Sequence, residues 1–358
     1  MELRTCSEIT LTLSHAKMRR LYLEDVKVIC GQTLNSFRNL TFRRAFNAYK
    51  IFISYFLSIV TRKPIVWGKP VFFYIEPTNR CNFQCPECSS GQGRLTRPIG
   101  MMDTGIFQKL IDLIALDTFS VHLYLQGESY INKQIYDMIS YARQKKLYVS
   151  VSTNGSLIRK NNAGQIIKQA PDRLIFSMDG LDEDSYKAYR VGGTFAQADA
   201  ALNLLIETKK KLNAKTPFIE LQFIVMKSNE HQVDEVIRYG KMLGVDKVTL
   251  KTMQISSAEN ARKFMPRNKK YSRYILDGED LKIKSKLKNQ CFELWKTSVV
   301  TWDGKIVPCC FDKDAMYPLG DINQKSFTEI WHSEKYQEFR KRILENRRGA
   351  SMCNNCNS

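Results

Sequence analysis

Three closely spaced cysteines directly after a strand-like run constrain this chain more than any other feature. The apolar run Val71–Ile75 leads into Cys81-Asn-Phe-Gln-Cys85-Pro-Glu-Cys88, a C-x3-C-x2-C triplet. Three thiolates on one tight loop can hold three corners of an iron–sulfur cube. The fourth iron then has no protein ligand and stays open to a small molecule, as in catalytic metal sites. A zinc site or buried free thiols are the alternatives.

The spacing resembles the signature of the radical S-adenosylmethionine superfamily, and the resemblance covers residues 71–255. It implies a [4Fe–4S] cluster on Cys81, Cys85 and Cys88, with S-adenosylmethionine chelated to the open iron. It also implies that one electron from the reduced cluster cleaves the sulfonium, and that the 5′-deoxyadenosyl radical abstracts hydrogen from a substrate. The cofactors supply such chemistry, while the protein positions them and excludes water.

Length, charge and cysteine placement limit the remaining classes. A chain of 358 residues with 43% hydrophobic residues can hold one large domain and one or two small ones. Closely spaced cysteines favour metal binding over disulfides, so we expect a reducing, cytoplasmic compartment. The formal charge of +19 favours an acidic partner: a flavodoxin- or ferredoxin-type electron donor, an anionic membrane face or a phosphorylated substrate. Scattered solvated lysines are the alternative, and no specific nucleic acid is expected.

Four segments follow from composition: a basic, mostly helical extension (1–70), a core domain (71–255), a polar, lysine-rich linker (256–290) and a cysteine-containing domain (291–358). In the extension, aromatic and aliphatic residues recur at helical spacing over 42–63. This stretch is too short and too interrupted by charge to predict a membrane span. It indicates either a helix packed on the core or an interfacial helix making peripheral membrane contact.

Strand-like and helix-like runs alternate through the core domain, which predicts an α/β fold with a parallel sheet covered by helices. The predicted strands are Val71–Ile75, Phe119–Leu125, Leu147–Ser152, Arg173–Met178, Phe218–Val225 and Lys247–Lys251, with helices at Thr104–Ala115, Asn132–Gln144, Ala196–Lys211 and Glu230–Leu243. The family resemblance refines this to a partial (β/α)6 TIM-like barrel. Ligands of parallel sheets bind at the carboxyl ends of the strands, where the cysteine triplet lies.

Further site residues follow the later strands. Gly127-Glu128 resembles the Gly-Gly-Glu-Pro segment of the family, whose glutamate accepts a hydrogen bond from the methionine amino group. Gln126 and Ser129 depart from that segment, and an exposed loop glutamate is the alternative.

Hydroxyl, amide and guanidinium groups at the next strand ends complete the predicted cofactor site. Thr153 and Asn154 can bind ribose hydroxyls. By resemblance, Ser177 and Arg190 contact the ribose and the methionine carboxylate. The residue before the third cysteine is commonly aromatic in the family and packs near the adenine. Here it is Glu87, so Phe83 is the candidate for that apolar surface.

The second cysteine group lies in 291–358 and resembles the SPASM domain in its shortened, twitch-type form. Cys291, Cys309, Cys353 and Cys356 would hold one fully ligated auxiliary [4Fe–4S] cluster, and Cys310 could replace Cys309. A four-cysteine zinc site is the alternative.

The resulting hypothesis is a radical S-adenosylmethionine oxidoreductase that performs an oxidation or an oxidative bond formation on a small molecule or a peptide. The alternatives are a peptide or protein maturase and a non-catalytic iron–sulfur electron carrier. A third hypothesis makes the basic amino-terminal helix a membrane-docking element of an enzyme with a lipid-linked substrate.

Overall fold

The six apolar runs predicted as strands form one parallel sheet in the computed structural model, which describes residues 39–356. The strands are β1 (Phe72–Ile75), β2 (Ser120–Leu123), β3 (Tyr148–Thr153), β4 (Arg173–Ser177), β5 (Phe218–Val225) and β6 (Lys247–Thr252), each within two residues of its predicted ends. Neighbouring strands pair in sequence order from β1 to β6. The predicted α/β fold with a partial barrel is confirmed.

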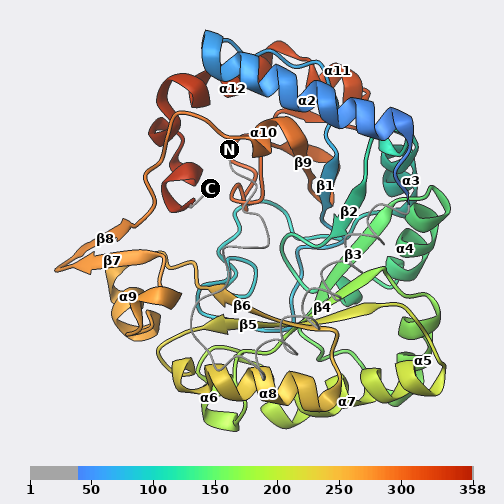
Figure 1. The fold of residues 1–358 in the computed structure, drawn as a ribbon, viewed down its shortest axis with the longest axis vertical. Helices are drawn as coiled ribbons and strands as arrows, with labels where there is room; N and C mark the ends of the chain where they lie inside the picture. The colour runs from blue at the N-terminus through green and yellow to red at the C-terminus, as the bar shows by residue number, and fades with distance from the viewer. Residues whose placement is uncertain (1–38, 357–358) are drawn as a thin grey trace, which may run out of the picture. The chain divides into compact units, whose positions relative to one another are not determined.

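Helices cover the outer face of this curved sheet (Figure 1). They are α3 (Thr104–Ile114), α4 (Ile135–Gln144), α5 (Lys160–Lys168), α6 (Glu183–Lys187), α7 (Phe195–Lys211) and α8 (Val233–Leu243), with short 3-10 turns η1 (Ser129–Ile131) and η2 (Glu230–Gln232). Several of these helices have an amino-terminal cap from a side chain. At the start of α3, for example, the Asp103 carboxylate accepts a hydrogen bond from the Gly105 amide. Outward-facing strand residues such as Phe73, Val121 and Val149 are fully buried against these helices.

The inner face of the barrel is polar. Tyr74 stacks on His122 with ring centroids 4.7 Å apart, and Tyr124 packs against both rings. Farther around, Arg173 and Glu220 form an ion pair of 2.6 Å. Alternate strand residues point to opposite faces, so the barrel has an apolar outside and a hydrogen-bonding inside.

The cysteine-containing segment continues the same sheet. Strand β9 (Thr297–Val300) pairs in parallel with β1, and β10 (Lys305–Val307) and β11 (Gly320–Asp321) follow antiparallel, giving the order β11-β10-β9-β1-β2-β3-β4-β5-β6. The remaining elements are α10 (Glu293–Lys296), α11 (Phe327–Trp331), α12 (Glu334–Asn346), η4 (Arg347–Gly349) and η5 (Ser351–Asn355). The carboxyl-terminal cysteines are therefore anchored to the first strand of the barrel.

The segment predicted as a polar linker has its own secondary structure. Residues 256–290 contain α9 (Ala258–Phe264), η3 (Lys269–Tyr271) and a hairpin of β7 (Tyr274–Asp277) and β8 (Asp280–Ile283). Phe264 and Tyr274 are buried in a small core cluster that also holds Phe83 and Cys85. This segment bridges the last barrel strand and the second cysteine group as a packed element.

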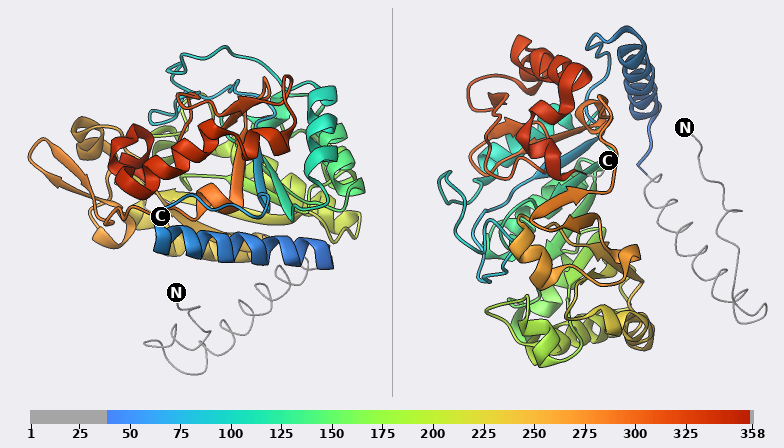
Figure 2. Two further views of the ribbon diagram at one scale, coloured as in Figure 1. Left: turned by 90° about the horizontal axis from the view of Figure 1, so that it is seen from above. Right: turned by 90° about the vertical axis from the view of Figure 1, so that its left-hand side faces the viewer.

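Helix α2 (Phe42–Thr61) lies beside the amino ends of β1, β2 and β3, where its Arg44 and Asn47 donate to backbone carbonyls. Figure 2 shows it on the side of the molecule opposite the loop that follows β1. Its Tyr55 packs on Phe292 and Trp295, with centroids 4.8 and 5.1 Å apart. Residues 1–38 of the predicted extension lie outside the described part of the chain. Within the described part, no helix is long and apolar enough to cross a membrane.

Candidate functional site

The three cysteines lie on a loop that begins where β1 ends. The loop is closed by Asn79, whose amide donates to the Pro98 carbonyl and whose oxygen accepts from the Gly100 amide, both at 2.9 Å. At its base the buried Glu76 forms a two-pronged ion pair with Arg97, at 2.6 and 2.7 Å. These contacts hold a long irregular segment at one edge of the sheet.

Backbone amides point at the sulfur atoms of this loop. The Phe83 amide donates to Cys81 Sγ and the Gly91 amide donates to Cys88 Sγ, both at 3.5 Å. Burial raises the pKa of the Cys81 thiol to about 11. Without a metal, a thiol in this environment keeps its proton, and it loses that proton when it binds a metal ion. Backbone amides that donate to sulfur are typical of iron–sulfur ligands. The loop therefore fits an iron–sulfur cluster.

Glu128 is buried beside the triplet. One carboxylate oxygen accepts from the Thr153 hydroxyl at 2.8 Å and from the Tyr130 amide at 3.3 Å, and the other accepts from the Asn154 amide at 2.7 Å. Burial raises the pKa of Glu128, while these donors lower it. The negative charge of Glu128 in turn raises the pKa of the Cys81 thiol.

Gly127 allows this close approach. Its φ is +76°, and a side-chain carbon at this position would lie 2.4 Å from the Arg80 carbonyl oxygen. The Arg80 carbonyl also accepts a hydrogen bond from the backbone amide of Glu128 at 2.7 Å. Arg80 is the residue directly before Cys81. The predicted pair Gly127-Glu128 is thus joined directly to the cysteine loop.

Asn154 makes a second link between strand β3 and the loop. Its side-chain amide donates to Asn82 at 3.1 Å, and Asn82 donates to the Ser156 hydroxyl at 2.7 Å. Asn82 and Ser156 are not among the site residues predicted from the sequence. Their only local signal is that one lies inside the cysteine triplet and the other lies two residues beyond Asn154.

Arg190 and Ser177 also lie at this end of the barrel. The Arg190 guanidinium donates to the buried Asp179 carboxylate at 2.6 Å through two nitrogens. Its charge also lowers the pKa of Cys85 against the effect of burial. Ser177 is the buried last residue of β4. Asp179 orients Arg190, although no role for Asp179 is predicted from the sequence.

Phe83 does not provide the free apolar surface considered for the adenine. It is only 3% exposed and packs against Gly193, whose added side-chain carbon would meet the ring at 2.4 Å. Glu87 is also buried and accepts from the Ser256 hydroxyl at 3.2 Å. This position therefore has a polar environment.

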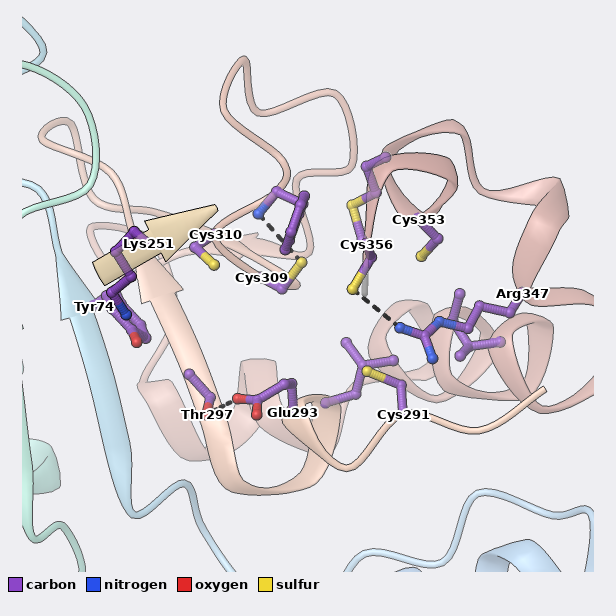
Figure 3. Close-up of a pocket in the computed structure, with 14 residues that line it drawn as sticks. Tyr74, Lys251, Cys291, Glu293, Thr297, Cys309, Cys310, Arg347, Cys353 and Cys356 are labelled. Atoms are coloured by element: carbon purple, nitrogen blue, oxygen red, sulfur yellow. Dashed lines mark hydrogen bonds between the residues drawn. The ribbon is translucent and has the colours of Figure 1, made fainter. Parts of the chain in front are cut away.

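The second cysteine group surrounds a cavity of about 470 Å³. Its lining includes Cys291, Cys309, Cys310, Cys353, Cys356, Arg347, Tyr74, Lys251, Glu293 and Thr297 (Figure 3). Arg347 donates to Cys356 Sγ at 3.2 Å, and the Phe311 amide donates to Cys309 Sγ at 3.4 Å. Burial raises the pKa of Cys291 to about 11.

Figure 3 separates the two adjacent cysteines. The thiol of Cys309 points toward Cys356 and Cys353, whereas Cys310 lies on the side of Lys251 and Tyr74. The thiols surround a space and do not converge on a point: within residues 39–356, no three His, Cys, Asp or Glu side chains are grouped so as to hold a metal ion. The volume and the sulfur donors fit a cluster.

Lys313 lies between the two cysteine groups, because it lines a small pocket with Glu87 and Ser89, which flank Cys88, and with Asn355, next to Cys356. Its ammonium donates to Gln254 at 2.8 Å, and burial lowers its pKa, while the nearby Cys88 and Cys310 raise it. Nothing in the local sequence marks this lysine. Only the folded chain places it beside both groups.

Comparisons with known proteins agree with this geometry. Residues 75–239 match the family model of the radical SAM superfamily, and residues 291–357 match the SPASM iron–sulfur cluster-binding domain. The tungsten-containing aldehyde ferredoxin oxidoreductase cofactor-modifying protein of Pyrococcus furiosus is 25% identical over 75% of this chain and 83% of its own length. The antilisterial bacteriocin subtilosin biosynthesis protein AlbA of Bacillus subtilis is 24% identical over 74% of this chain and 60% of its own length.

Among solved structures, SuiB of Streptococcus suis has a similar fold. Its complexes with S-adenosylmethionine and with the precursor peptide SuiA each give a TM-score of 0.57 at 13% identity. The match covers 77% of this chain and 68% or 67% of SuiB.

The two family models together decide the nature of both cysteine groups. The cofactors are a [4Fe–4S] cluster with S-adenosylmethionine and an auxiliary iron–sulfur cluster, so the zinc and electron-carrier alternatives are not supported. The chain belongs to the radical S-adenosylmethionine superfamily of enzymes, with a SPASM-type auxiliary cluster domain at residues 291–357.

Proposed function

We propose that this enzyme abstracts a hydrogen atom from its substrate and completes a two-electron oxidation or an oxidative bond formation with the help of the auxiliary cluster. The cofactors, when bound, supply the radical and accept the second electron. The observation that carries the proposal is the buried Glu128, which Thr153 and Asn154 hold beside Cys81. An electron carrier would have no need of such a carboxylate.

At the first site, Cys81, Cys85 and Cys88 would ligate the cluster. Glu128 would accept from the amino group of S-adenosylmethionine, since a buried carboxylate binds an ammonium group through charge-assisted hydrogen bonds. Arg190, oriented by Asp179, would offer positive charge to the methionine carboxylate.

Polar groups at neighbouring strand ends would complete the nucleotide contacts. Thr153, Asn154 and Ser177 lie at the carboxyl ends of β3 and β4, where hydroxyl and amide groups can bind ribose hydroxyls. Gly127 would contribute through its backbone, because its conformation brings Glu128 to the loop.

At the second site, Cys291, Cys309, Cys353 and Cys356 would ligate the auxiliary cluster. The Arg347 guanidinium beside Cys356 would favour a more negative cluster and so ease its reduction. Cys310, on the side of Tyr74 and Lys251, would remain a free thiol.

The substrate class is a small polar molecule or a peptide side chain. The polar interior of the barrel, with Tyr74, His122 and Tyr124, suits a hydrogen-bonding substrate of either kind. Peptide maturation is the second candidate, because AlbA is named for bacteriocin biosynthesis and SuiB was solved with a precursor peptide. A small acidic electron donor of the flavodoxin or ferredoxin type would complement the formal charge of +19.

Metal content of matched variants tests the ligand assignment. After anaerobic reconstitution the protein should hold about eight irons. Cys309→Ala should lose about half of them, whereas the adjacent Cys310→Ala should keep all of them. Equal loss in both variants, or the reverse order, would contradict the assignment of Cys309.

Cofactor cleavage tests the proposed chemistry. Replacing Cys81, Cys85 and Cys88 by Ala should abolish reductive release of 5′-deoxyadenosine. Replacing Cys353 and Cys356 by Ala should leave some release and remove product formation with the chosen substrate. Release of 5′-deoxyadenosine by the triple variant would show that the first cluster is elsewhere.

A further inference from the structure

Helix α2 buries several polar residues and exposes most of its aromatic residues. Arg44, Asn47, Ser54 and Ser58 are buried against the rest of the protein together with Ile51, and Tyr55 is the one aromatic residue that packs inward. The outer face consists of Phe42, Phe46, Tyr49, Phe52, Phe56 and Val60, which are between 44% and 87% exposed. We call these six residues the aromatic stripe. A surface helix normally has the opposite arrangement.

The inward polar face has a structural purpose. Arg44 donates to the carbonyls of Ala115 and Lys146 at 2.7 and 2.8 Å, and Asn47 donates to those of Lys69 and Asp117 at 2.8 and 3.0 Å. These carbonyls lie just before β1, β2 and β3, where backbone groups have no partner in the sheet. The inner face therefore satisfies them, and this contact fixes the aromatic stripe outward.

The stripe is continuous along the helix. Its members are spaced three or four residues apart, which places them on one face. Phe42 stacks on Phe46 with centroids 6.2 Å apart, and Phe46 stacks on Tyr49 at 6.4 Å. A contiguous exposed apolar surface of this kind marks an interaction site.

Three cations beside the stripe have no acidic partner among the described residues. Residues 42–75 contain no Asp or Glu and six basic residues, of which Arg43 and Lys69 pair with Asp117 at 2.7 and 3.8 Å and Arg44 is buried. The other three are Lys50, Arg62 and Lys63. The Lys50 ammonium lies 5.5 Å from the centre of the Phe46 ring. Two copies of the chain meeting through α2 would bring these like charges together, which disfavours self-association.

We propose that the aromatic stripe docks on an anionic lipid bilayer. Aromatic rings flanked by Lys and Arg are the composition that binds the headgroup region, where rings enter the boundary and cations meet anionic lipids. The helix would lie in the plane of the surface. This interaction goes beyond the proposed reaction and does not depend on it.

Docking also fixes the orientation of the enzyme. Helix α2 lies at the amino ends of β1, β2 and β3, whereas the cysteine loop follows the carboxyl end of β1, on the opposite side in Figure 2. A protein bound through the stripe would therefore present its active site to the water. This geometry favours a substrate delivered from solution over the lipid-linked substrate considered from the sequence.

Vesicle co-sedimentation of the full-length, reconstituted protein tests the proposal. We expect binding to phosphatidylcholine vesicles that contain phosphatidylglycerol, and binding at least tenfold weaker to phosphatidylcholine alone or at high salt. Phe46→Gln with Phe56→Gln should weaken binding at least about tenfold. The matched control is Met242→Gln with Met316→Gln. Both residues lie outside α2, they are 77% and 68% exposed, and their replacement should leave vesicle binding unchanged.

Lys50→Gln and Lys63→Gln should each weaken binding to the anionic vesicles by about fivefold. Three results would overturn the proposal: no vesicle binding, binding that persists in the Phe46/Phe56 variant, or a dimer in solution that only this variant dissociates. Iron content and 5′-deoxyadenosine release, measured without vesicles, should be the same in all variants, so failure here is distinct from failure of the proposed function.

Discussion

Replacing Glu128 by Ala should destabilise the protein as well as weaken cofactor binding. The carboxylate is 3% exposed and accepts from the Asn154 amide, the Thr153 hydroxyl and the Tyr130 amide. Losing the acceptor of the buried Asn154 amide costs about 1–3 kcal/mol. The Thr153 hydroxyl can rotate and the Tyr130 contact is long, so together they add about 1 kcal/mol. Release of a buried charge offsets part of this, and we expect a net loss of about 2–3 kcal/mol.

Denaturant unfolding of the cluster-free protein measures this loss without the cofactor. Glu128→Gln is the matched control, because its amide keeps one oxygen acceptor and the same shape, and it should cost about 1 kcal/mol. In the cluster-loaded protein, Glu128→Ala should bind S-adenosylmethionine about ten- to a hundredfold more weakly. An unchanged unfolding free energy in the Ala variant would refute the contacts, and unchanged affinity with full iron would refute the cofactor role.

Two further predictions concern the barrel. Gly127→Ala should reduce the number of irons bound per chain after reconstitution, because the new methyl group would collide with the Arg80 carbonyl and the φ of +76° disfavours a side chain. The control is Gly164→Ala, which adds its methyl group to open space. This variant should bind iron normally and should be at least as stable as the unchanged protein. Burial holds the pKa of His122 at about 4. Its unfolded pKa is about 6.5, so stability is fully present above pH 6.5 and falls by up to about 3 kcal/mol as the pH drops to 4. His122→Gln should flatten the pH dependence of the unfolding free energy over this window, and an equally steep curve in the variant would assign the loss to other groups.

The sequence predicted the parallel strands well, because each strand is a short apolar run that local composition marks. The pairing of β9 with β1 could not be predicted in this way. These strands are far apart in the chain, and nothing in either run indicates the other. The cysteine domain was therefore expected as a separate module, whereas it extends the barrel sheet.

Helix α2 shows the same division. Its extent followed from spacing, and its observed bounds of Phe42–Thr61 agree with the prediction over 42–63. Which face is buried depended on the unpaired carbonyls before β1, β2 and β3, which only the folded sheet presents. Those carbonyls attract Arg44 and Asn47 and leave the rings outside.

The spacing of Cys81, Cys85 and Cys88 was enough to indicate the superfamily, because a cluster-binding loop needs only closely spaced thiols at the end of a strand. Tertiary structure decided which distant groups serve that loop. It placed Glu128 beside the cysteine loop, turned Cys309 toward Cys353 and Cys356, and brought Lys313 between the two cysteine groups. Such placements depend on contacts between segments far apart in the chain, and local spacing carries no information about them.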